Sequence, residues 1–273
     1  MIRVKRNMIV MLFFVFLGLH CSVQSPNSSV QKKSVSFSMS LHDRVTGSGL
    51  TLSFVDSMNL LVITKNDTQN MALPFDGVNA DTQLTIPSGI AVRFLIHAYK
   101  NSLLILQGDT VFTAKAGEKI DLILSLDFIY PAVILTPAKQ EVQAGDILQF
   151  DIAVRAIDEK FYKAVTRIEF NPDILRFKSA IKNEDFLKQE AGYVTVQLTD
   201  TDGMLIHDVE ITPRASGVSG DGSLTRIRME ALRSGLVTVL VSSDPAVAPN
   251  LGIYDLNDQL ISAVNLGCMI AVN

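Results

Sequence analysis

Few side chains in this sequence combine the types and the spacing that catalysis or metal binding requires. The four histidines, His20, His42, His97 and His207, are scattered, and none has a second His or a Cys at ligand spacing, as a zinc site needs. The Gly-x-Ser-x-Gly elbow of serine hydrolases is also missing, because the segment Gly217–Asp221 has its second glycine one position too early. The sequence therefore predicts no enzyme activity, no metal site and no cofactor.

The segment Asp200–Gly203 invites a calcium-binding interpretation. In a helix-loop-helix calcium loop, three spaced oxygen ligands precede the glycine and a carboxylate follows it by six residues. With Gly203 in the glycine position, the first and last ligand positions fall on Leu198 and Val209. Neither side chain can bind the ion, so a two-residue hairpin turn at Asp202-Gly203 is the better prediction.

The N-terminus has the pattern of an export signal over residues 1–20. Arg3, Lys5 and Arg6 precede an uncharged apolar stretch, Met8–Leu19, which is too short to span a bilayer. The alternative is a membrane anchor that is retained. Without these twenty residues the formal net charge moves from -4 to about -7, and no basic run follows Lys32-Lys33. The sequence therefore predicts no nucleic-acid partner, because phosphate binding needs clustered Lys and Arg.

Cys21 follows the apolar stretch and resembles the lipidated cysteine of bacterial lipoproteins. Residues 21–33 are polar and read as a flexible tether. This resemblance implies an exported protein of the cell envelope, held on a membrane through lipidated Cys21; cleavage near Ser25, which would leave an extracellular protein, is the alternative. The remaining cysteine, Cys268, lies in an apolar run and is expected to be a buried, unreactive residue.

The exported part of the chain alternates apolar and polar residues in short runs that are separated by Gly, Asn, Asp and Pro. This pattern is typical of β-strands and predicts an all-β protein with two β-sandwich domains. Pro131 disfavours a helix and cannot donate to a strand ladder, so we expect a boundary near residues 127–131. The predicted domains are residues 34–127 and 131–273.

The second half of the first domain carries a recognisable order of turns. An Ile-Pro-Ser-Gly turn at Ile86–Gly89 precedes a strand ending in Ala98-Tyr99, and an Ala-Gly-Glu turn at Ala116–Glu118 precedes the last strand. This order resembles the immunoglobulin-like domain of bacterial surface lipoproteins. The resemblance implies a β-sandwich and no activity.

In the second domain, residues 164, 166, 168 and 170 should point to one face of a strand, and Val165, Arg167 and Glu169 to the other. Asn171-Pro172-Asp173 predicts a tight turn after this strand. Further along, the segment Ser223–Leu232 alternates: Leu224, Ile227, Met229 and Ala231 are expected to point inward, and Thr225, Arg226, Arg228 and Glu230 mostly outward.

Several motifs of this domain occur in the order that cohesin domains show. They are Ala144-Gly145-Asp146, the segment Phe170–Phe177, the Gly-rich stretch Gly217–Leu224, Gly235 and the final strand Met269–Val272. The second domain therefore resembles a cohesin. The resemblance implies a jelly-roll β-sandwich that binds a dockerin-like protein module, or a carbohydrate, without covalent chemistry.

In cohesins that hold dockerins, outward residues of the strand before the Asn-Pro turn contribute to the binding face. The matching positions here are Val165, Arg167 and Glu169, where dockerin-binding families tend to carry small polar or acidic residues at the first two. The resemblance therefore implies an exported binding protein with this face as its site. Val165 and Arg167 depart from the pattern of dockerin-binding families at this face. The alternatives are a solvated face without a partner, a structural or adhesion subunit that self-associates at the cell surface, and, least favoured, a hydrolase.

Overall fold

The computed structural model describes residues 32–43, 55–75, 79–87, 89–113, 115, 119–187 and 193–273. Most of these residues are in strands, and the helical elements among them are α1 (Glu184–Leu187) and the 3-10 turn η2 (Arg214–Ser216). The prediction of an all-β chain is confirmed. The predicted signal sequence and Cys21 lie outside the described residues, and the first described strand begins at Lys32, inside the stretch expected to be a tether.

The first part of the chain forms a seven-stranded sheet in the order β3-β2-β5-β6-β7-β1-β4. β1 pairs with β4 in antiparallel and with β7 in parallel orientation. β2 and β5 alternate buried and exposed residues, and Leu60, Val92, Phe94 and Ile96 have no exposed surface. The strands are β1 (Lys32–Asp43), β2 (Ser57–Ile63), β3 (Thr68–Ala72), β4 (Asn79–Pro87), β5 (Ala91–Lys100), β6 (Leu103–Thr113) and β7 (Lys119–Phe128).

The second part contains twelve strands that are all connected through pairing. Its core is a continuous cluster of buried aliphatic and aromatic side chains, which includes Phe150, Phe161 and Ile227. The strands are β8 (Ala132–Thr136), β9 (Lys139–Val142), β10 (Ile147–Glu169), β11 (Leu175–Lys182), β12 (Tyr193–Thr201), β13 (Met204–Thr212), β14 (Val218–Ala231), β15 (Gly235–Ser242), β16 (Gly252–Asp255), β17 (Leu260–Ile261), β18 (Val264–Leu266) and β19 (Cys268–Val272).

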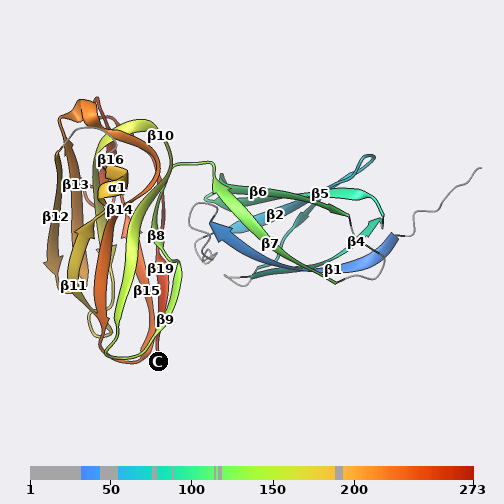
Figure 1. The fold of residues 1–273 in the computed structure, drawn as a ribbon, viewed down its shortest axis with the longest axis horizontal. Helices are drawn as coiled ribbons and strands as arrows, with labels where there is room; N and C mark the ends of the chain where they lie inside the picture. The colour runs from blue at the N-terminus through green and yellow to red at the C-terminus, as the bar shows by residue number, and fades with distance from the viewer. Residues whose placement is uncertain are drawn as a thin grey trace, which may run out of the picture. The chain divides into compact units, whose positions relative to one another are not determined.

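β10 joins two sets of strands because its two halves have different partners (Figure 1). Its first half, up to Ile157, pairs with β14 and β8, whereas residues from Phe161 to Glu169 pair with β13, β16 and β15 and keep one β14 partner, Val218 opposite Phe161. Between the halves the ladder shifts register, and Ala156 has a φ of 52°. The backbone N–H of Ala156 donates to Asp221 Oδ1 at 2.7 Å, which holds this left-handed residue in place. One strand thereby serves both layers of the sandwich.

Two predicted turns of the second domain are present. The backbone N–H of Asp173 donates to Asn171 Oδ1 at 2.9 Å, which closes the turn between β10 and β11. β12 and β13 form a hairpin around Asp202-Gly203, where Gly203 has a φ of 78°. A Cβ on Gly203 would lie 2.9 Å from the Phe170 carbonyl oxygen, so this turn requires glycine for both conformation and space.

The expected alternation along β14 is correct at every position except Thr225. Leu224 and Thr225 are consecutive, yet neither has exposed surface. Ile152 of β10 faces Thr225, while the next residue, Ala153, faces Ser223, so Leu224 is an extra residue in the ladder. This β-bulge reverses the side on which the preceding residues lie and turns both Leu224 and Thr225 inward.

The buried Thr225 belongs to a polar cluster inside the sandwich. His207 of β13 has no exposed surface; its Nδ1 lies 3.2 Å from Thr166 Oγ1 on β10, and its Nε2 lies 2.7 Å from Thr225 Oγ1 on β14. Both ring nitrogens therefore have a hydroxyl partner. We call Thr166, His207 and Thr225 the core polar cluster; it ties three strands together across the hydrophobic interior.

Candidate functional site

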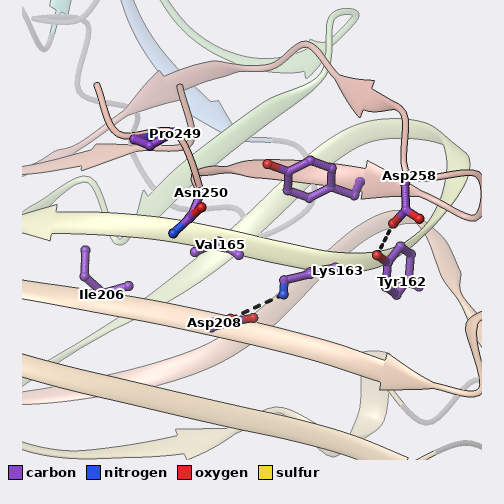
Figure 2. A pocket seen from close by; sticks show the side chains of 9 residues that line it. Tyr162, Lys163, Val165, Ile206, Asp208, Pro249, Asn250 and Asp258 are labelled. Carbon is purple, nitrogen blue, oxygen red and sulfur yellow. Dashed lines mark hydrogen bonds and ion pairs between the residues drawn. The ribbon is translucent and has the colours of Figure 1, made fainter. Parts of the chain in front are cut away.

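The predicted binding residues Val165, Arg167 and Glu169 lie on one side of the second half of β10. The residues between them are fully buried. Arg167 and Glu169 keep 29% and 41% of their side-chain surface exposed, but Val165 keeps only 4%. Val165 thus lies on the predicted face but is covered instead of exposed, and Pro249 and Asn250 lie above it (Figure 2).

β13 contributes the neighbouring row of side chains. Directly paired residues of antiparallel strands point to the same side of a sheet, so the β13 partners share the surface of the predicted residues. The pairs are Lys163 with Glu210, Val165 with Asp208, Arg167 with Ile206 and Glu169 with Met204. We call these eight residues the β10–β13 face.

The charged side chains of this face are paired with one another. Lys163 Nζ lies 3.6 Å from Asp208 and 3.7 Å from Glu210, and Arg167 Nε lies 2.8 Å from Glu169 Oε1. All five side chains are between a quarter and a half exposed. Partly exposed pairs of this kind are worth about 0–1 kcal/mol, so the charges can exchange partners when another charged surface approaches.

A pocket of about 540 Å³ opens at one end of the β10–β13 face. Figure 2 shows Lys163 reaching toward Asp208 across its floor, with Asn250 and Pro249 above Val165. The wall at the other end is Tyr162 and Asp258, which are joined by a hydrogen bond. The lining residues are Tyr162, Lys163, Val165, Ile206, Asp208, Pro249, Asn250, Tyr254 and Asp258.

The wall of the pocket is held by three residues from distant parts of the chain, which we call the rim cluster: Tyr162, Arg214 and Asp258. The Tyr162 hydroxyl donates to one oxygen of Asp258, and Arg214 donates to the other. The Arg214 guanidinium also lies 4.3 Å from the centre of the Tyr162 ring, within range of a cation–π interaction. Asp258 has a φ of 62°, a left-handed conformation that Asp adopts more readily than most residues.

The rim cluster shifts the titration of its members in directions that follow from its geometry. Hydrogen bonds from Tyr162 and Arg214 stabilise the carboxylate and lower the pKa of Asp258. Burial, and then the hydrogen bond to Asp258, raise the pKa of Tyr162 to about 12. The phenol therefore remains a neutral hydrogen-bond donor, and Asp258 remains charged, throughout the physiological pH range.

Two leucines extend the surface beyond the pocket, on β15. β15 pairs with the end of β10, with Glu169 opposite Leu240 and Arg167 opposite Ser242. Leu236 is 64% exposed and Leu240 is 47% exposed. Aliphatic side chains at such exposure next to a charged row provide the mixture that protein partners bind: apolar contact area with charges at its margin.

Two groups that are reactive in other settings are buried here. Burial lowers the pKa of His207 to about 3 and raises the pKa of the Cys268 thiol to about 12. Both are thus neutral at physiological pH, and neither lies in the pocket. Among the described residues, no group of three or more His, Cys, Asp or Glu side chains could hold a metal ion, and no helix is long and apolar enough to cross a membrane.

The sequence patterns predicted three residues of the β10–β13 face, Val165, Arg167 and Glu169, but not its β13 half, the rim cluster or the leucines of β15. Tyr162, Arg214 and Asp258 are separated by 44 residues or more, and no local pattern connects them. The run Gly235–Ser242 has apolar residues on both sides of the strand, so alternation could not tell which of them would be exposed.

Comparison with known proteins gives a family match for the second part of the chain. Residues 133–261 match the family model of the cohesin domain. No curated protein matches the sequence.

Solved cohesin structures resemble about half of the chain. CaCohA2 from Clostridium acetobutylicum is 22% identical over 52% of this chain and 91% of its own, with a TM-score of 0.43. A non-cellulosomal cohesin from the archaeon Archaeoglobus fulgidus is 13% identical over 53% of this chain and 91% of its own, with a TM-score of 0.42. A cohesin–dockerin complex from Clostridium thermocellum is 11% identical over 53% of this chain and 99% of that chain, with a TM-score of 0.44.

Proposed function

We propose that the cohesin-type region, residues 133–261, binds a dockerin-like protein module without covalent chemistry, through the β10–β13 face and the adjoining leucines of β15. The observation that carries this proposal is the match of this region to the cohesin family model. The cohesin in the Clostridium thermocellum structure is in complex with a dockerin. We infer the same class of partner for this chain, with a recognition surface of its own.

The composition of the surface supports protein recognition. Leu236 and Leu240 provide exposed apolar area, and Arg167 and Glu169 lie beside Leu240 on the neighbouring strand. Interfaces of this kind obtain most of their binding free energy from a few anchors, and the surrounding charges select the partner. With Val165 covered, Arg167 and Glu169 remain to select a partner whose surface differs from that of a standard dockerin.

Binding can be tested with the segment Gln31–Asn273, which forms one compact unit. We expect it to bind at least one member of a panel of purified dockerin modules, measured by biolayer interferometry. Leu240→Arg places a charge in the centre of the surface and should weaken binding at least tenfold. The matched control is Ile181→Arg, because Ile181 is similarly exposed, at 55% against 47% for Leu240, but lies on β11.

Two outcomes would contradict this proposal. The first is an absence of binding to every dockerin module together with no specific capture of a dockerin-containing protein from a secreted fraction. The second is equal loss of binding for Leu240→Arg and Ile181→Arg, since this would place the interface elsewhere or indicate misfolding. Circular dichroism of both variants separates these explanations.

A polysaccharide is the second candidate ligand for the same face. The pocket is lined by Tyr254, Asn250 and Asp208. An aromatic ring can pack against a sugar ring, and the amide and the carboxylate can form hydrogen bonds with sugar hydroxyls. Binding of a glycan array that is lost with Asn250→Ala but retained with Leu240→Arg would favour this ligand, because Asn250 lines the pocket and Leu240 does not.

We also propose that the protein acts outside the cell and is tethered to a membrane through lipidated Cys21, with the first seven-stranded sheet as an immunoglobulin-like spacer. Support comes from the sequence pattern at residues 1–33. Mass analysis of the mature N-terminus tests this directly: two acyl chains on Cys21 are expected, and a chain that begins after Ser25 would contradict it.

A further inference from the structure

β12 lies at an open edge of the second group of strands. It pairs with β13 along all nine of its residues and with no other strand that the structure describes. An unpaired edge exposes backbone N–H and C=O groups to other strands, and proteins protect such edges with Lys, Pro or a β-bulge. The strand Tyr-Val-Thr-Val-Gln-Leu-Thr-Asp-Thr contains neither residue, and its register with β13 has no shift. Among the strands that the structure describes, the outer edge of β12 is therefore available for strand addition.

The hairpin turn determines which backbone groups point outward. β12 and β13 are joined by two residues, and the pair that closes such a turn, Thr201 with Met204, exchanges hydrogen bonds. Hydrogen-bonded pairs alternate along an antiparallel ladder. The N–H and C=O groups that are directed to the open edge are therefore those of Val194, Val196, Leu198 and Asp200.

The side chains of β12 also sort into two rows. Val194, Val196 and Leu198 are half-buried and pack against the core of the sandwich. Thr195, Gln197 and Thr199 are exposed on the opposite side. A strand added to this edge would find an apolar row on one side and an uncharged polar row on the other.

We propose that the occupant of this edge is β12 of a second copy of the chain, in antiparallel orientation about a twofold axis at Gln197. In this register Val196 faces Leu198 of the second copy, Thr195 faces Thr199, Gln197 faces itself, and Val194 faces Asp200. Only this register pairs all four outward residues with one another. The two sheets then continue into one across the axis.

The central pairs are chemically matched, whereas Val194 faces Asp200 at each end of the paired segment. Val196 and Leu198 bring two half-buried apolar side chains together, the threonines form a cross-strand pair of a favourable kind, and no charge faces a like charge. A single pair of strands buries less surface than the roughly 1,200 Å² of a stable complex. The dimer is accordingly a weak one that forms at high local concentration, as on a crowded surface.

This inference does not depend on the ligand of the β10–β13 face. Its measurements are mass and cross-linking of the chain alone, so its failure leaves the dockerin-binding test unaffected. For the segment Gln31–Asn273, sedimentation equilibrium should show the average mass rising toward that of a dimer as the concentration approaches the millimolar range. Gln197→Lys places two like charges on the axis and should leave a monomer.

Cross-linking tests the register itself. The Cα atoms of a non-hydrogen-bonded antiparallel pair lie about 4.5 Å apart, within the range that a disulfide spans. Gln197→Cys should therefore form a disulfide-linked dimer under mild oxidation. Thr195→Cys is the matched control, since two such cysteines would lie about 13 Å apart along the paired strands; Cys268 is buried and does not interfere.

We expect the Gln197→Cys dimer to form at least ten times faster than the Thr195→Cys dimer. Equal rates would overturn the register, and a chain that stays monomeric at millimolar concentration would overturn the dimer. Mixing Gln197→Lys with Gln197→Glu gives a further check, because opposite charges on the axis should restore association that neither variant shows alone.

Discussion

The core polar cluster and the rim cluster solve the same structural problem in opposite ways. Each joins three side chains from distant parts of the chain. Inside the sandwich, His207 lies between two threonine hydroxyls and is neutral. At the edge of the pocket, Asp258 lies between Tyr162 and Arg214 and is charged.

The difference follows from access to water. A buried group must be hydrogen-bonded, and a buried charge is far more costly than a buried neutral dipole. The core polar cluster therefore contributes to stability and is closed to ligands. The rim cluster can keep its charges because Arg214 and Asp258 are about half exposed, which leaves it available to shape the pocket.

Substituting His207→Leu should have the largest effect of the four changes considered. It leaves the hydroxyls of Thr166 and Thr225 buried without their shared partner, and each buried unsatisfied group costs about 1–3 kcal/mol. We expect a loss of about 2–4 kcal/mol in the free energy of unfolding, measured by urea denaturation. A loss below about 1 kcal/mol would mean that the cluster does not hold the two layers together.

Acid should weaken the fold through the same histidine. The pKa of His207 is about 3 in the folded protein against an ordinary value of 6.5, so between these values the unfolded chain binds one more proton. Protonation of His207 therefore does not lower the free energy of unfolding above pH 6.5. Below that pH it lowers this free energy by about 1.4 kcal/mol per pH unit, until the pH reaches about 3.

The measurement is urea denaturation at pH 7.5, 6 and 5, a range in which most carboxylates remain charged. We expect about 1–2 kcal/mol to be lost between pH 6.5 and 5. His207→Gln is the control, because it retains hydrogen bonding without titrating, and it should flatten the dependence. If the pH dependence is unchanged in this variant, the proton taken up on unfolding binds to a group other than His207.

Tyr162→Phe should have a smaller effect on stability. It removes the hydrogen bond to Asp258 but keeps the ring under Arg214, so we expect a loss of about 1 kcal/mol. The ionisation of tyrosine gives a second readout: the wild-type chain should have a phenol that titrates near pH 12, and ultraviolet titration should show its disappearance in the variant. A loss as large as that of His207→Leu would erase the distinction between the two clusters.

Arg214→Gln should change stability least. Arg214 is half exposed, where water screens its interactions, so the urea midpoint is expected to remain within error of the wild type. Ligand binding at the pocket should respond instead, because Asp258 loses a partner that orients it. A clear drop in the midpoint would show that the rim cluster is structural.

Much of the second domain could be predicted from local patterns. The turn at Asn171-Pro172-Asp173 and the hairpin at Asp202-Gly203 depend on residues with special backbone preferences, and both are present in the structure. The alternation on β10 correctly separated buried Thr166 and Ile168 from Arg167 and Glu169. These features are local, because a strand presents its side chains with a period of two.

Predictions from alternation were incorrect where another segment intervened. Val165 is covered because Pro249 and Asn250, just before β16, lie above it, and Thr225 is buried because Leu224 forms a bulge opposite β10. Neither Pro249-Asn250 nor β10 is adjacent in the sequence to the residue whose burial it decides. Alternation describes a strand by itself, whereas burial is decided by what packs against it.

The sequence by itself therefore determined the all-β class, the main turns of the second domain and the row of residues on β10. Only the tertiary structure decided that β10 serves two layers, that His207 joins Thr166 to Thr225, and that Tyr162, Arg214 and Asp258 meet at a pocket. The physical reason is distance along the chain. Backbone preference and side-chain period act over a few residues, while these contacts join segments that are 18 to 96 residues apart and exist only once the strands have paired.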